Sequence, residues 1–172
     1  MRFTRRSQLR AFTPLTAAAL LACPAAPAAS AAEARTEASS SDTCTLGVRA
    51  AAHPGRDRVV LDLGERTLPE VSSWTSTTGS YHTPADTTQY MTVRATSYLF
   101  LKLFLAHFYD SAGNPTYKSP DVQPFGLPAV KGVQVVDGFE GRAEFALSLG
   151  PSTRYSAFTL TQPNRVVIGV YR

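Results

Sequence analysis

Apolar and polar residues alternate with a period of two along most of the chain after Cys44, and this is the period of a β-strand. No long apolar stripe repeats at the helical period of 3.6 residues. Turn signals such as His53-Pro54-Gly55 and Pro163-Asn164 separate the alternating segments. The pattern predicts strands near residues 46–52, 58–63, 71–75, 98–109, 130–136, 143–149, 155–161 and 166–170.

The most apolar segment, residues 98–109, is expected to be a central strand. Both of its faces are apolar, which is typical of a strand covered on both sides. A helix remains the alternative, because periodicity does not classify a continuous apolar run. As a strand, the segment would place Leu99, Leu101, Leu103 and Leu105 on one face and Phe100, Phe104 and Phe108 on the other.

Residues 130–136 and 143–149 are expected to pair as a hairpin across Asp137-Gly138. The polar segment of residues 67–92 is expected to hold one short strand and then a long loop. Together these elements predict an all-β, single-domain antiparallel sandwich or partly open barrel of about seven or eight strands. The core side of the strand at residues 143–149 would carry Phe145, Leu147 and Leu149, and its solvated side Arg142, Glu144, Ala146 and Ser148. The core side of the last strand would carry Val166, Ile168 and Val170.

The N-terminus has the pattern of a bacterial-type secretion signal. Four arginines within residues 1–10 precede an apolar stretch at residues 11–22, which is shorter than the roughly 20 residues a membrane-spanning helix needs. Small-residue cleavage triplets follow. We therefore expect a secretion signal at residues 1–31, a disordered linker at residues 32–43 and the β domain at residues 44–172. The mature protein would be extracytoplasmic.

Two features of the leader leave the export route and the anchor open. Thr4-Arg5-Arg6-Ser7-Gln8-Leu9-Arg10 resembles a twin-arginine signal, although paired arginines also occur in ordinary leaders. Leu20-Leu21-Ala22-Cys23 resembles a lipobox, so the signal would end at residue 22 if Cys23 is lipidated. The protein would then be tethered to the outer face of the cytoplasmic membrane rather than secreted. Either way Cys44 is left alone, as a chance residue or as an intermolecular thiol.

The basic excess of the chain belongs to its leader. The chain has 17 basic and 13 acidic residues, and without the four leader arginines the 13 remaining basic residues equal the acidic ones in number. This balance gives no support for binding nucleic acid.

The usual sequence signatures of catalysis and cofactor binding are missing. His53, His82 and His107 are far apart and show no metal-ligand spacing, and no Gly-x-Ser-x-Gly elbow or glycine-rich phosphate loop occurs. Glu140 and Glu144 are suited to a glycosidase pair, but the intervening Arg142 favours a solvated strand face. We expect no cofactor, no metal and no enzymatic activity.

Aromatic residues in the polar segment offer a candidate binding surface. Trp74, Tyr81 and Tyr90 are suited to stack on sugar rings. The alternative is that they cap a small satellite core under the long loop.

Three blocks of the chain resemble the AMIN-like domain of actinobacterial exported proteins and lipoproteins. The resemblance covers most of residues 46–172. The blocks are Asp57-Arg58-Val59-Val60-Leu61-Asp62-Leu63, Asp137-Gly138-Phe139-Glu140-Gly141, and Phe158-x-Leu160-x-x-Pro163-x-Arg165-Val166-Val167-Ile168-x-Val170. One position departs from the family, because Gly169 stands where Asp is common. That Asp would either help to bind a ligand or pair with Arg165.

The resemblance implies an all-β, non-catalytic module that binds peptidoglycan or targets the protein to the cell wall. On that basis Arg58 and Arg165 are the expected basic contacts to anionic wall groups, although both also fit ordinary strand-end arginines. A protein–protein interaction module of the envelope is the alternative, with a partner at a sheet edge or at the Cys44 thiol. A glycan-active enzyme holding Glu140 or His82 in a pocket is the third possibility.

Overall fold

The computed structural model describes residues 42–172, so the signal, Cys23 and most of the linker lie outside it. These residues form twelve strands and no α-helix. None of them belongs to a helix able to cross a membrane. The all-β prediction is confirmed, but the expected seven or eight strands are too few. The extra strands are two or three residues long, and alternation over so short a stretch gives no readable signal.

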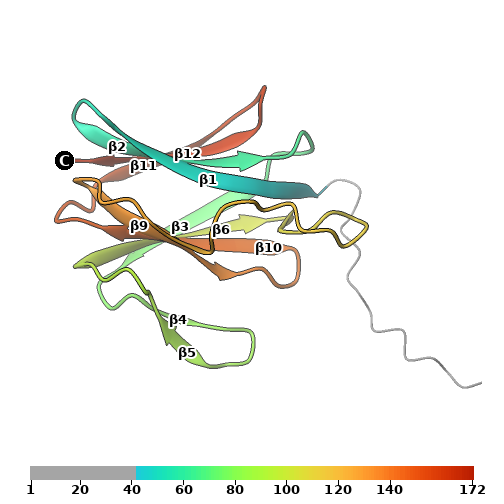
Figure 1. The fold of residues 1–172 in the computed structure, drawn as a ribbon, viewed down its shortest axis with the longest axis horizontal. Helices are drawn as coiled ribbons and strands as arrows, with labels where there is room; N and C mark the ends of the chain where they lie inside the picture. Colours follow the sequence, from blue (N-terminus) through green and yellow to red (C-terminus); the bar gives the residue numbers. More distant parts are fainter. Residues whose placement is uncertain (1–41) are drawn as a thin grey trace, which may run out of the picture. The chain divides into compact units, whose positions relative to one another are not determined.

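Two five-stranded sheets stack face to face as a sandwich (Figure 1). Sheet I has the order β11 (Tyr155–Leu160), β12 (Arg165–Tyr171), β2 (Arg56–Leu63), β1 (Thr43–His53) and β7 (Ala106–His107). Sheet II has the order β3 (Glu70–Ser76), β6 (Ser97–Phe104), β10 (Arg142–Leu149), β9 (Val130–Asp137) and β8 (Val122–Pro124). A separate hairpin of β4 (Ser80–His82) and β5 (Thr88–Tyr90) lies on the far side of sheet II (Figure 1).

The main core fills the space between the sheets with alternate residues of their central strands. Leu61 on β2 and Leu101 on β6 are fully buried there. The inward faces predicted for the strands at residues 143–149 and 166–170 are confirmed, since Phe145, Leu147, Leu149, Val166, Ile168 and Val170 all belong to this cluster. The hairpin of residues 130–149 is confirmed as well, because β9 and β10 pair antiparallel.

The apolar segment of residues 98–109 is not one strand. β6 ends at Phe104, and Leu105 follows with a left-handed φ of 59° and 58% of its surface exposed. The chain then crosses to sheet I, where β7 pairs in parallel with β1. The strand prediction is confirmed for β6 and the helix alternative is wrong. Leu105 does not face the core and Phe108 does, because the left-handed residue interrupts the alternation.

A second apolar cluster covers the outer face of sheet II. Tyr98, Phe100 and Ala146 of sheet II are buried there together with Met91 of the 77–96 segment. The Ser148 hydroxyl donates to the Val93 carbonyl at 2.6 Å. Ala146 and Ser148 therefore point away from the main core as predicted, but they are buried rather than solvated.

A buried carboxylate connects the two sheets. Asp57 of β2 accepts hydrogen bonds from the backbone N–H groups of Ala129 and Val130, at the start of β9, and from the Arg172 guanidinium at 2.7 Å. Burial alone would raise the pKa of Asp57, but these donors outweigh it and hold the pKa below its ordinary value. Asp57 thus links the strand that carries Arg58 to sheet II.

Candidate functional site

The outer face of sheet I carries a group of arginines. The turn after His53 places His53 opposite Arg56. Every second residue of β2 then points outward, and these residues include Arg56, Arg58 and Asp62. On the adjacent strands, Arg49 lies opposite Val60, and Arg165 opposite Asp62. We call Arg49, Arg56, Arg58 and Arg165 the arginine face.

A cavity of about 280 Å³ lies on this face, and we call it the Arg165 cavity. The buried side chain of Val60 lies in it, and arginines from three strands surround it. The cavity is lined by Arg49, Ala50, Ala51, His53, Arg58, Val60 and Arg165. It therefore brings together the two arginines that the sequence proposed, Arg58 and Arg165.

The acid on this face neutralises only part of its charge. Asp62 accepts two hydrogen bonds from Arg49, at 2.9 and 3.0 Å, and they raise the pKa of Arg49. The Arg165 Nε atom is 3.9 Å from Asp62, too far for a hydrogen bond. The Nε atoms of Arg58 and Arg165 are both buried without a hydrogen-bond partner. The excess of arginines over this one carboxylate suits an external anion, because guanidinium groups bind oxyanions through paired N–H donors.

A smaller hollow of about 80 Å³, the Gly169 cavity, lies on the other side of Arg58. Its lining comes from three adjacent strands of sheet I: Arg56, Arg58, Ser156, Phe158, Val167 and Gly169. Gly169 faces Arg58 across the β12–β2 pair, so an acidic side chain at this position would lie beside Arg58 rather than Arg165.

Two members of the arginine face, Arg49 and Arg56, were missed from the sequence. The signal was present, because a tight turn at Pro54-Gly55 fixes which residues of the two strands share a side. Counting outward from that turn places residues 49, 56 and 58 on one face.

The aromatic candidates lie elsewhere, on sheet II. Trp74 stacks on Phe100 with ring centroids 5.3 Å apart, and 42% of its surface is exposed. Tyr81 packs against the second cluster and accepts a hydrogen bond from Gln134 at 2.9 Å. Both residues therefore help to cover sheet II, and neither lies near the arginine face.

The residues proposed for catalysis are dispersed. His82 is exposed on the β4–β5 hairpin and lies 3.8 Å from Asp86. Glu140 is exposed in the β9–β10 turn and lies 3.5 Å from Arg142. Glu144 is largely buried and pairs with Lys102 at 2.7 Å. These three side chains do not converge on one pocket.

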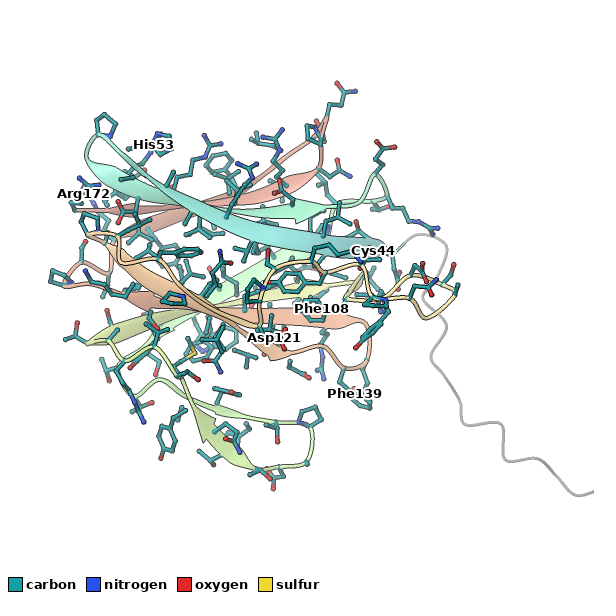
Figure 2. All side chains as sticks on the ribbon, viewed as in Figure 1. Cys44, His53, Phe108, Asp121, Phe139 and Arg172 are labelled. Carbon is teal, nitrogen blue, oxygen red and sulfur yellow. The ribbon has the colours of Figure 1, made fainter. Side chains whose placement is uncertain are left out.

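A third hollow of about 560 Å³, the Phe139 cavity, lies between the segment of residues 108–121 and the end of β9. Aromatic side chains line it together with Asp121 and Asp137. Burial raises the pKa of its Tyr117 to about 12, which keeps that hydroxyl neutral. Figure 2 shows Phe139 and Asp121 well away from His53, which lines the Arg165 cavity. No motif in the sequence predicted this hollow.

Cys44 is a free thiol near the start of β1. Its Sγ atom lies 3.6 Å from the carbonyl oxygen of Tyr109, and the residue is partly buried. Cys23, the lipidation candidate, precedes the described residues.

Comparison with known proteins gives one match. The family model described as the AMIN-like domain matches residues 43–172, which are most of the chain and nearly all of its described part. No curated protein and no solved structure matches the chain.

Proposed function

The chain belongs to the AMIN-like domain family, and we propose that it is a non-catalytic module that binds peptidoglycan in the cell wall. The family itself indicates a peptidoglycan-related module of the cell envelope, and its members are typically extracytoplasmic and non-catalytic. We propose in addition that this chain binds the wall polymer directly.

The arginine face is the observation that carries this proposal. It is an open surface with four arginines and one carboxylate, whereas the other sheet has its outer face covered. Peptidoglycan is a polyanion, because its stem peptides bear free carboxylates. An arginine-bearing face with one carboxylate is complementary to such a polymer in charge. Arg58 and Arg165 are the proposed contacts.

The test is co-sedimentation of the full chain with purified sacculi at low and moderate salt. We expect binding at low salt that weakens with salt, and a loss of at least three-fold for Arg165→Ala. The matched control is Arg94→Ala, because Arg94 lies 5.8 Å over the Tyr90 ring, away from the arginine face. Both variants keep the leader arginines, so any contribution from them cancels. Full recovery of the wild type in the supernatant at low salt would refute the proposal.

The proposed cellular location is the outer side of the cytoplasmic membrane, with the protein either secreted or held by a lipid on Cys23. Mass spectrometry of the protein recovered from its host separates these forms. A diacylglyceryl mass on an N-terminal Cys23 supports the anchor, and an N-terminus beyond residue 23 excludes it.

An interaction with another envelope protein is the second candidate, and strand β11 favours it. β11 is the edge strand of sheet I, and it exposes Phe158 and Leu160. An edge strand with free backbone groups can accept a strand from a partner. Crosslinking in cells would give one discrete adduct that Phe158→Ser removes, and the absence of any adduct would exclude this candidate.

A further inference from the structure

The Gly169 cavity is lined by two arginines and a serine, and a glycine without a side chain lies among them. Gly169 is opposite Arg58 on one neighbouring strand and opposite Ser156 on the other. A Cβ atom at position 169 would lie 3.2 Å from the Ser156 hydroxyl oxygen and 3.4 Å from Cδ of Arg56. The Ser156 hydroxyl and the Arg56 side chain are therefore nearest to the position where a side chain would begin, and Arg58 lines the same cavity.

The charge around this position is uncompensated by the described part of the chain. Asp62 is the one carboxylate that the strand registers place on the outward side of sheet I in residues 42–172, and it is engaged with Arg49. Arg58 has its Nε atom buried and without a hydrogen-bond partner. Nearby, a hydrogen bond with Ser156, together with the cations of Arg56 and Arg154, holds the pKa of Tyr171 below its ordinary value. With Arg56 and Arg58 in its lining and no carboxylate of the described residues beside them, the cavity has a positive potential.

We propose that the Gly169 cavity binds a free carboxylate group of the ligand, held by Arg56, Arg58 and Ser156. The inference rests on the proposed function, and within it the group is the carboxylate that ends a stem peptide of the wall. A cavity of about 80 Å³ accommodates a carboxylate and a small substituent rather than a sugar ring. The ring of Phe158, which lines the cavity with 48% of its surface exposed, offers an apolar wall to that substituent.

The same geometry provides a variant that fills the site from within. The backbone at Gly169 lies outside the left-handed region, so the φ angle does not oppose a side chain there. Its closest neighbour would be the Ser156 hydroxyl oxygen at 3.2 Å, which must move by a few tenths of an ångström and is 3.4 Å from the Tyr171 hydroxyl. Gly169→Asp would place a carboxylate beside Arg56 and Arg58 and exclude the ligand. Thr88→Asp adds the same charge on the exposed strand β5 and is the matched control.

The direct test is an NMR titration of the ¹⁵N-labelled full chain with acetyl-D-alanyl-D-alanine. The expected result is saturable shifts at the amides of Ser156, Gly169 and Arg58, weakened at least ten-fold when the peptide carries a C-terminal amide. Gly169→Asp should abolish these shifts and raise the melting temperature, while Thr88→Asp leaves the shifts unchanged. Equal shifts with the amidated peptide, or with Gly169→Asp, would overturn the proposal, as would no shift at these amides.

Sedimentation with sacculi separates this inference from the proposed function. If the wild type and Gly169→Asp sediment equally, the carboxylate site is refuted and wall binding stands. If the wild type does not sediment, the proposed function fails, and the peptide titration decides the carboxylate site by itself. Sacculi stripped of phosphate polymers should bind as well as untreated ones, and loss of binding after stripping would assign the site to phosphate instead.

Discussion

The outer faces of the two sheets are built from the same alternating pattern and are used in opposite ways. On sheet II the outward residues Phe100 and Ala146 are buried under the 77–96 segment, and Gln134 holds that segment by accepting from the Thr92 N–H at 2.8 Å. On sheet I the outward positions hold arginines, and cavities lie between them. One face therefore adds to the stability of the domain, and the other keeps polar groups available for contact.

The largest effect is expected from the covered face, on changing Phe100→Ala. Phe100 is buried and stacks on Trp74, so its truncation leaves a cavity beneath the 77–96 segment. We expect the free energy of unfolding to fall by about 3–5 kcal/mol. Urea denaturation checks this value. A loss below about 1 kcal/mol would mean that the segment contributes little to stability, and the contrast between the two faces would be wrong.

A smaller loss of stability is expected from Asp57→Asn, because Asp57 links β2, which carries Arg56 and Arg58, to the start of β9 in sheet II. The substitution removes the charged partner of Arg172 and weakens the hydrogen bonds from Ala129 and Val130, so we expect a loss of about 1.5–3 kcal/mol at pH 7.

The ion pair of Asp57 and Arg172 also predicts that the free energy of unfolding depends on pH. Because the pKa of Asp57 is lower in the folded state than in the unfolded one, its contribution is complete above the ordinary value of about 4. That contribution disappears as the pH falls from there through the folded-state pKa. The difference in stability between the wild type and Asp57→Asn should therefore shrink below about pH 4. A difference that stays constant down to pH 2 would contradict this role of Asp57.

A gain in stability is expected at the crossing between the sheets, on changing Leu105→Gly. The left-handed backbone at Leu105 is strained for leucine and free for glycine, and the exposed side chain adds little packing. The expected gain is up to about 1 kcal/mol, since the flexibility of glycine offsets part of the relief. Thermal unfolding of Leu105→Gly beside Leu103→Gly, which should be strongly destabilised, provides the comparison. A destabilised Leu105→Gly would show that the exposed side chain has a partner.

The smallest effect on stability is expected on the open face, from Arg58→Ala. No carboxylate in residues 42–172 forms an ion pair with Arg58, so we expect the free energy of unfolding to change by less than about 0.5 kcal/mol. Binding to sacculi should nevertheless fall several-fold. A large loss of stability with unchanged binding would show that Arg58 stabilises the fold and does not contact the ligand.

The sequence predicted the parts of this molecule that depend on local alternation. The β9–β10 hairpin and the inward residues of β12 follow from period two and a turn signal. The arginines at positions 49 and 56 were within reach of the same reasoning, because the Pro54-Gly55 turn fixes the register.

The features that the sequence did not predict depend on contacts between distant segments. Ala146 and Ser148 look solvated in their strand, and only the 77–96 segment buries them. Leu105 continues the series of leucines at every second position of residues 99–105, and no local sequence signal predicts its left-handed backbone. The Phe139 cavity likewise arises where residues 108–121 meet the end of β9, so no single segment contains it.

The binding surface can be mapped by following the backbone amide shifts of the full chain by NMR as soluble muropeptides are added. If the open face of sheet I is the binding surface, the amides of Arg49, Arg58 and Arg165 should shift and those of the 77–96 segment should not. Shifts confined to Trp74 and Tyr81 would contradict it and place the binding surface on sheet II, and shifts confined to the Phe139 cavity would contradict it and place the binding surface there.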